Sequence, residues 1–237
     1  MSWMERYAKG PTPAEVKAAA KAAGYNVGPV YHGSAAEGLT FFDPSLLGTI
    51  RTSDWGKSGV YFTPSRGIAE NYRVQAVKEL DEEDERLWQE WERKAEEFGT
   101  SIMYVSIDHR RGKITDEQEQ ELREIEKRWR QNREELDETL KGEVYPVYLM
   151  IRNPLVYRYV GITDPYLSEL AGSRGQDAVV VTSEDADTSG PIESWAEEIL
   201  VFEPWQIKSA APATYDDAGN PIPLEQRFDS SNPDMRY

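Results

Sequence analysis

The sequence predicts a mixed α+β domain that is interrupted by a pair of charged helices. Short apolar segments typical of strands occur before residue 77 and after residue 142. Between them the chain is dominated by Glu, Asp, Arg and Lys, with apolar residues at helical spacing. We therefore expect one domain over residues 1–237, with a charged helical insertion at 77–142 and an extended C-terminal tail at 211–237.

Local signals predict the regular elements outside the insertion. Thr12 is a typical N-cap, Pro13 suits the first helical position and Glu15 can complete a capping box, so a helix is expected from here to Gly24. Residues 48–59 are rich in Gly, Ser, Thr and Asp and are expected to form a loop. Further helices are expected at 64–76 and 164–171, and strands at 29–33, 60–63, 144–151, 155–160, 177–182 and 198–202.

The insertion carries two apolar stripes, which predict two helices over 77–100 and 114–141, packed as an antiparallel pair. Stripes of this kind more often pack helices together than bind a ligand. The composition of 101–108 predicts a short β-like piece between the helices. The acidic pair could also serve as an arm that binds a partner protein. The stripes consist of Leu80, Leu87, Trp91, Ala95 and Phe98, and of Leu122, Ile125, Trp129, Leu136 and Leu140.

Composition excludes several classes of site. The net charge of -16 repels phosphate backbones, so broad binding of nucleic acid is not expected. The chain has no cysteine and 2 histidines, which rules out thiolate chemistry and disulfides and argues against a metal site. No apolar run has the length of a membrane span, and residues 1–10 lack the apolar core of a signal peptide. We expect no membrane partner and a cytoplasmic location, in the producing cell or in a cell into which the protein is delivered.

Three short segments contain the candidate chemical groups. The first is Val30-Tyr31-His32-Gly33, and the second runs from Gly56 to Phe62 and contains Tyr61, with Tyr72 eleven residues after it. The third is Glu198-Ile199-Leu200-Val201-Phe202. Each segment alone is ordinary, because a His-Gly pair at a strand end or a Glu at the start of a strand is usually structural. Their order and spacing in one chain are what point to a function.

In these segments the chain resembles the ADP-ribosyltransferase superfamily, on the side that includes diphtheria toxin and the poly(ADP-ribose) polymerases. That side is marked by a His, a Tyr and a Glu on three strands, which His32, Tyr61 and Glu198 match. The resemblance covers residues 24–76 and 143–237 and leaves out the helical insertion. From Glu198 to Ser209, and again at 214–217 and 232–234, the chain is similar to transferase domains of phage and mobile-element polyproteins.

The resemblance implies a split β-sandwich around a cleft for NAD, which would be a co-substrate. It gives Glu198 the role of stabilising the cationic ribose and binding its 2′-hydroxyl. It places the nicotinamide between the rings of Tyr61 and Tyr72 and the carboxamide against the backbone of Gly33. His32 would bind a ribose hydroxyl, and Ser34 would belong to the same cofactor site. His32, Tyr61 and Glu198 are thus the expected catalytic set, with no metal.

Three departures from the family pattern accompany the match. Ala69 stands where the family often has a Ser that contacts the carboxamide, and Ser58 is an extra residue in the second segment. Glu197 lies directly beside Glu198. Because adjacent residues of a strand point to opposite faces, only one of these two glutamates can belong to the site, and the match selects Glu198.

The resemblance implies a mono-ADP-ribosyltransferase, of the phage or bacterial effector or toxin kind, that moves ADP-ribose from NAD to a macromolecular acceptor and releases nicotinamide. The acceptor is expected to be a protein, and Ala196, two residues before the Glu, disfavours arginine. Alternatives are an NAD glycohydrolase and a non-catalytic NAD-binding or interaction protein that uses the helical insertion. An RNA 2′-phosphotransferase is disfavoured, because that activity depends on Arg and His contacts to phosphates, and this chain has 2 histidines and a net charge of -16.

Overall fold

The computed structural model describes residues 10–43, 59–79, 81–139, 141–159 and 167–237. The chain divides into two compact units. The body is Met1–Arg73 with Glu143–Tyr237, and the helical unit is Val74–Gly142. Within the described ranges, no helix combines the length and the apolar composition needed to cross a membrane.

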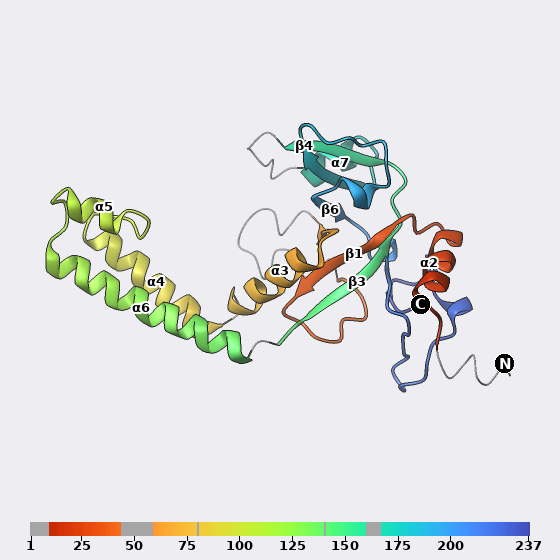
Figure 1. Ribbon diagram of the computed structural model, residues 1–237, viewed down its shortest axis with the longest axis horizontal. Helices are drawn as coiled ribbons and strands as arrows, with labels where there is room; N and C mark the ends of the chain where they lie inside the picture. Colours follow the sequence, from red (N-terminus) through yellow and green to blue (C-terminus); the bar gives the residue numbers. More distant parts are fainter. Residues whose placement is uncertain (1–9, 44–58, 80, 140, 160–166) are drawn as a thin grey trace. The chain divides into compact units, whose positions relative to one another are not determined.

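The body is a mixed α+β structure with two sheets, as the sequence predicts (Figure 1). Sheet A has the order β1-β3-β7 and is antiparallel, and sheet B has the order β2-β6-β5-β4, in which only β4 and β5 run parallel. Tyr31 exchanges two backbone hydrogen bonds of 2.8 and 2.9 Å with Thr63, so the two sheets adjoin where β1 meets the end of β2. The strands are β1 (Val27–Ser34), β2 (Val60–Phe62), β3 (Glu143–Leu149), β4 (Pro154–Tyr159), β5 (Ala178–Ser183), β6 (Glu198–Val201) and β7 (Ile207–Ser209).

Both sheets contribute to one buried core. Val30 and Val147 of sheet A pack in the same cluster as Val180 and Ile199 of sheet B. The outer face of sheet B forms a second cluster, where Leu200 packs with residues of α7 (Leu167–Ser173). Because side chains alternate along a strand, the neighbours Ile199 and Leu200 serve opposite faces of the same sheet. The space between the sheets is therefore packed with apolar side chains.

Helix α2 (Pro13–Ala22) covers the outer face of sheet A and begins where its capping signal predicts. The Thr12 hydroxyl accepts a hydrogen bond from the Glu15 amide at 3.3 Å, and the Thr12 amide donates to the Glu15 carboxylate at 2.8 Å. Gly24 follows the helix with a φ of +95°, a conformation that glycine adopts without strain. Helix α3 (Arg66–Glu79) follows β2.

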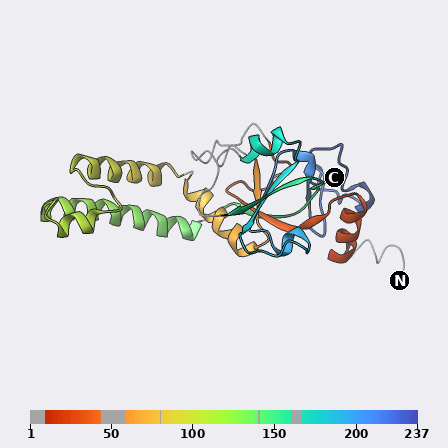
Figure 2. The same ribbon diagram turned by 90° about the horizontal axis from the view of Figure 1, so that it is seen from above.

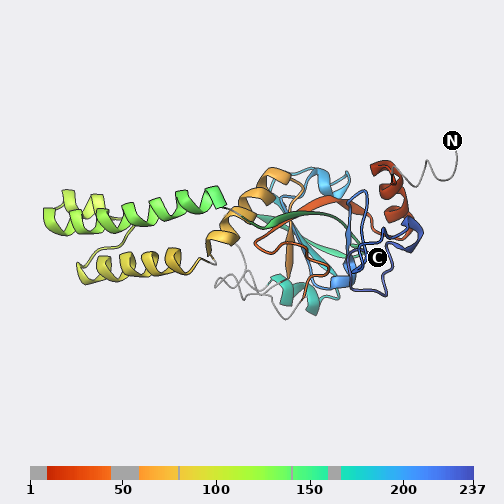
Figure 3. The ribbon, with the colours of Figure 1, turned by 90° about the horizontal axis from the view of Figure 1, so that it is seen from below.

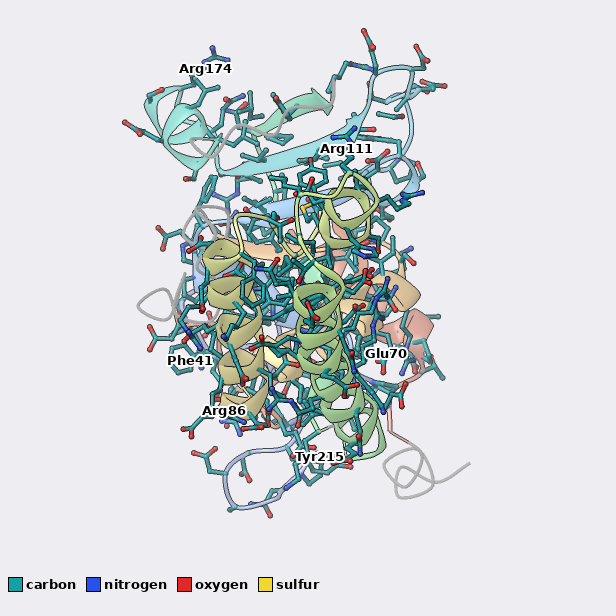
Figure 4. The ribbon with its side chains drawn as sticks, turned by 90° about the vertical axis from the view of Figure 1, so that its left-hand side faces the viewer. Phe41, Glu70, Arg86, Arg111, Arg174 and Tyr215 are labelled. Atoms are coloured by element: carbon teal, nitrogen blue, oxygen red, sulfur yellow. The ribbon has the colours of Figure 1, made fainter. Side chains whose placement is uncertain are left out.

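The helical unit is an antiparallel pair of α4 (Glu82–Glu97) and α6 (Asp116–Thr139), which confirms the predicted pair (Figures 2 and 3). Arg133 of α6 holds Asp84 of α4 through two bonds of 2.9 Å, so the end of one helix lies beside the start of the other. Charged side chains such as Arg86 lie on the outer sides of the pair (Figure 4). The apolar stripes face each other, with Leu87, Trp91, Ala95, Leu122 and Ile125 buried.

The predicted β-like piece at 101–108 is wrong, because this segment contains the short helix α5 (Val105–Arg110). The Asp108 amide donates to the Tyr104 carbonyl at 2.8 Å, and the Thr100 hydroxyl donates to the Asp108 carboxylate at 2.7 Å. These local bonds satisfy polar groups that a strand could satisfy only with a neighbouring strand. Apolar composition alone does not distinguish the two outcomes in so short a segment.

The C-terminal segment 211–237 has little regular structure, yet it belongs to the body's core. Phe228 and Met235 are buried. The buried ammonium group of Lys208 donates to the carbonyls of Asn232 and Asp234 at 2.6 and 2.7 Å. Buried Arg227 donates in the same way to the carbonyls of residues 209, 211 and 212. Two cations thus hold in place a segment whose regular structure is limited to the 3-10 helix η5 (Leu224–Gln226) and a bridge between Tyr215 and Pro221.

Burial of Lys208 makes the stability of the body depend on pH. Desolvation lowers the pKa of Lys208 to about 8, against roughly 10.4 in an unfolded chain. Between these values the unfolded chain holds more protons, so the free energy of unfolding should rise with pH, by at most about 1.4 kcal/mol per pH unit. Urea unfolding at several pH values from 7.5 to 9.5 measures this slope.

The matched variant for this prediction is Lys208→Met, which keeps the volume of the side chain but cannot titrate. The variant should be less stable at every pH, and its slope between pH 7.5 and 9.5 should be smaller than that of the parent chain. Arg227, whose pKa burial lowers to about 10, and Tyr145, whose pKa burial raises to about 12, add to the slope only near the upper end of this window, and they are present in both chains, so the difference in slope reports Lys208. An equal slope in the two chains would show that Lys208 is not the titrating group.

Candidate functional site

The candidate residues come from four elements of the body: β1, β2, α3 and β6. His32, Gly33 and Ser34 lie at the end of β1, and Tyr61 is the middle residue of β2. Tyr72 lies on α3, and Glu198 is the first residue of β6. The sequence segments that were singled out therefore meet around the edge where the two sheets adjoin.

Glu198 and Tyr72 are in direct contact. The Tyr72 hydroxyl donates a hydrogen bond of 2.7 Å to Oε1 of the Glu198 carboxylate. Both side chains are half-buried, whereas the neighbouring Glu197 is exposed. The Glu197 amide donates to the Val181 carbonyl, which anchors the backbone where β6 begins beside β5. The two glutamates thus lie in different environments, and the one selected from the sequence is the one that contacts Tyr72.

Tyr61 shares a face of sheet B with Glu198. In the register of β2 and β6, Tyr61 is opposite Leu200, two residues along the strand from Glu198. Residues two apart on a strand point to the same side, so Glu198 is the diagonal neighbour of Tyr61. Tyr61 packs against the outer cluster of sheet B. The side chains expected to line a cleft between the two sheets therefore lie on the outer face of sheet B, and the space between the sheets is occupied by the core.

His32 lies on the other side of this edge, against the core. Its ring packs edge-on to Phe42 at 5.0 Å and lies 5.6 Å from the Phe62 ring. Nδ1 is 2.7 Å from the Tyr61 carbonyl oxygen. A carbonyl can only accept, so Nδ1 carries the proton, and in the neutral ring Nε2 is an acceptor. This contact links His32 to the strand that bears Tyr61.

Gly33 is required by the close approach of α3. A Cβ at this position would lie 1.9 Å from the Ala69 carbonyl oxygen and 2.7 Å from the Arg73 amide nitrogen. The glycine therefore admits the helix backbone that carries Tyr72, a reason that the sequence does not reveal. Its own N–H and C=O point to the same edge of β1 as those of Tyr31, because alternate residues of a strand share an edge.

Ser34 stabilises the turn after β1, and its hydroxyl accepts a hydrogen bond from the Ala36 amide at 3.1 Å. Ala69, the departure from the family pattern, is fully buried on the side of α3 that faces Gly33. Residues 56–58 at the start of the second sequence segment, which include Lys57 and Ser58, lie outside the described residues.

Two features of the site were missed at the level of sequence. Phe42 packs between His32, Phe62 and Tyr145. Its signal in the sequence is weak: Phe42 follows another aromatic residue, Phe41, and precedes the turn-forming pair Asp43-Pro44. The ion pair of Arg73 and Glu70 lies next to Tyr72 on α3, with the two charged groups 2.6 Å apart. Its i,i+3 spacing could have indicated it.

In the part of the chain that the structure describes, no group of three or more acidic or histidine side chains is arranged to hold a metal ion. Comparison of the chain with family models, with curated proteins and with solved structures found no match.

Proposed function

We propose that this protein is an NAD-dependent ADP-ribosyltransferase. The observation that carries the proposal is the 2.7 Å hydrogen bond between Tyr72 and Glu198, which are 126 residues apart in the sequence. The sequence resemblance assigns both residues to one NAD site without reference to any structure. That assignment requires the two side chains to lie near each other, and the hydrogen bond between them supports it.

The surroundings of the pair support the same assignment. Tyr61 is on the face of sheet B that bears Glu198, next to the helix that bears Tyr72, so two aromatic rings and a carboxylate border one region. A cationic nicotinamide suits such a region, because aromatic faces attract cations. Nδ1 of His32 is bonded to the Tyr61 carbonyl, so in the neutral ring Nε2 can accept a hydrogen bond from a ribose hydroxyl.

The proposed reaction breaks the bond between the nicotinamide nitrogen and C1′ of the ribose. Nicotinamide leaves with the bonding electron pair, and a positive charge develops on the ribose. The Glu198 carboxylate stabilises this charge and accepts a hydrogen bond from the 2′-hydroxyl. A nucleophile on the acceptor then forms a bond to C1′ and loses its proton, which the same carboxylate can receive.

The test is to incubate the purified chain with NAD that is labelled in its adenine half, with and without a cell lysate. A transferase releases nicotinamide and labels an acceptor in the lysate. A glycohydrolase releases nicotinamide at the same rate in both mixtures and leaves every macromolecule unlabelled. Binding of NAD without release of nicotinamide identifies a non-catalytic binding protein and contradicts the proposal.

A further inference from the structure

We infer that Tyr72 has two separable roles, in which its ring contacts the nicotinamide and its hydroxyl positions the Glu198 carboxylate. The inference rests on the proposed function and adds a positioning residue to it. The sequence match assigns a stacking ring to this position and gives no role to the hydroxyl. The 2.7 Å hydrogen bond to Oε1 is the observation that assigns one.

The carboxylate needs a support, because its backbone position alone does not fix it. A glutamate side chain has three rotatable bonds, and ordering them costs conformational entropy. Glu198 is only half-buried at the first residue of its strand, and the opposite residue on β5 is the apolar Val181. A hydrogen bond from Tyr72 selects one orientation of the carboxylate in advance, through contact with Oε1.

The hydroxyl is a rigid support because α3 is held at the backbone level. The backbone of α3 packs directly against Gly33 at the Ala69 carbonyl and the Arg73 amide, which flank Tyr72 along the helix. Ala69 has no exposed surface. A group that acts by positioning must itself be fixed, since errors of about 1 Å can cost roughly 100-fold in rate. The packing of α3 against β1 thus fixes the Tyr72 hydroxyl, which in turn holds the Glu198 carboxylate on β6.

The experiment compares Tyr72→Phe, which keeps the ring, with Tyr72→Ala, which removes it. In Tyr72→Phe the turnover number for nicotinamide release should fall by about 10- to 100-fold, the effect of one hydrogen bond to a charged group. The KM for NAD should stay within about twofold, since the ring remains. In Tyr72→Ala the turnover number should fall and the KM should also rise, because ring stacking contributes to binding. Tyr215→Phe, at an exposed tyrosine, is the matched control and should behave as the parent chain.

A second arm repeats Tyr72→Phe in a chain that carries Glu198→Ala. If the hydroxyl acts through the carboxylate, removing it there should change the residual rate by less than about twofold. An equal loss in both backgrounds, or an unchanged turnover number in Tyr72→Phe, would overturn the inference. An inactive parent chain would remove the proposed function and the inference together, whereas an active parent with an unaffected Tyr72→Phe would remove only the inference.

Discussion

Replacement of Glu198 by Gln should lower the turnover of NAD by about 100-fold or more, the scale of losing one electrostatic stabiliser of a transition state. The substitution keeps the size of the side chain and an oxygen that the Tyr72 hydroxyl can still contact, so that the loss reports the charge. The affinity for NAD and the midpoint of thermal unfolding should change little, because the charge acts mainly when the ribose becomes cationic. Nicotinamide release at saturating NAD measures the effect.

Glu197→Gln is the matched control for this prediction. Glu197 is exposed and lies in the bend just before β6, outside the strand that bears Glu198. Its loss should leave turnover within about twofold of the parent chain, because an exposed surface charge is screened by solvent. The opposite pattern, with Glu197→Gln inactive and Glu198→Gln normal, would show that the wrong glutamate has been chosen. Normal turnover in both variants would argue against the transferase.

Replacement of Gly33 by Ala should damage both the fold and the site. The new methyl group would lie 1.9 Å from a backbone oxygen of α3, which no side-chain rotation can relieve. The helix must move away from β1, at a cost of about 3 kcal/mol in the free energy of unfolding, the upper part of the range for overpacking. Tyr72 moves with the helix, so turnover should fall by roughly 100-fold even under conditions where the variant is folded.

Gly67→Ala provides a control on the same helix. The nearest atom to a Cβ there is the Ser65 hydroxyl oxygen at 3.8 Å, so the methyl group fits. Alanine in a helix should raise stability by roughly 0.5 to 1 kcal/mol and leave turnover unchanged. Urea unfolding and nicotinamide release, measured on both variants, separate an effect of the clash from a general effect of added methyl groups on α3. A Gly33→Ala chain as stable and active as the parent would contradict the packing of α3 against β1.

Most of the strands and the long helices could be predicted from the sequence because their signals are local, whereas strand β7 (Ile207–Ser209) of sheet A was not expected. The capping residues of α2 and the apolar stripes of α4 and α6 lie within a few turns of the structure that they determine. The prediction for 101–108 was wrong, because a short apolar segment can form a strand or a helix and only tertiary contacts decide between them. The tail was predicted as extended, but its burial depends on Lys208 and Arg227, whose carbonyl partners in the tail no sequence spacing indicates.

In the candidate site, too, some features could be predicted from the sequence, whereas others depend on tertiary packing. The resemblance selected Tyr72 and Glu198 as site residues, and the structure places the two side chains in contact. The reason for Gly33 could not be predicted, because it lies in the approach of a helix backbone rather than in the residue's own strand. The position of the side chains on the outer face of sheet B was also missed, since sequence alternation gives two faces but does not say which one is covered.

The topology of the body sets an order of events during synthesis. Strand β1 pairs with β3, so the ribosome must complete the whole of the helical unit before the first sheet can form. The contacts of α4 with α6 span a shorter stretch of chain, and units with local contacts fold fast. The helical pair should therefore be native while β1 still waits for its partner, and limited proteolysis of a released fragment of residues 1–142 should find a protected helical pair beside a digestible N-terminal segment. The polypeptide thus carries an early-folding module inside a late-folding one.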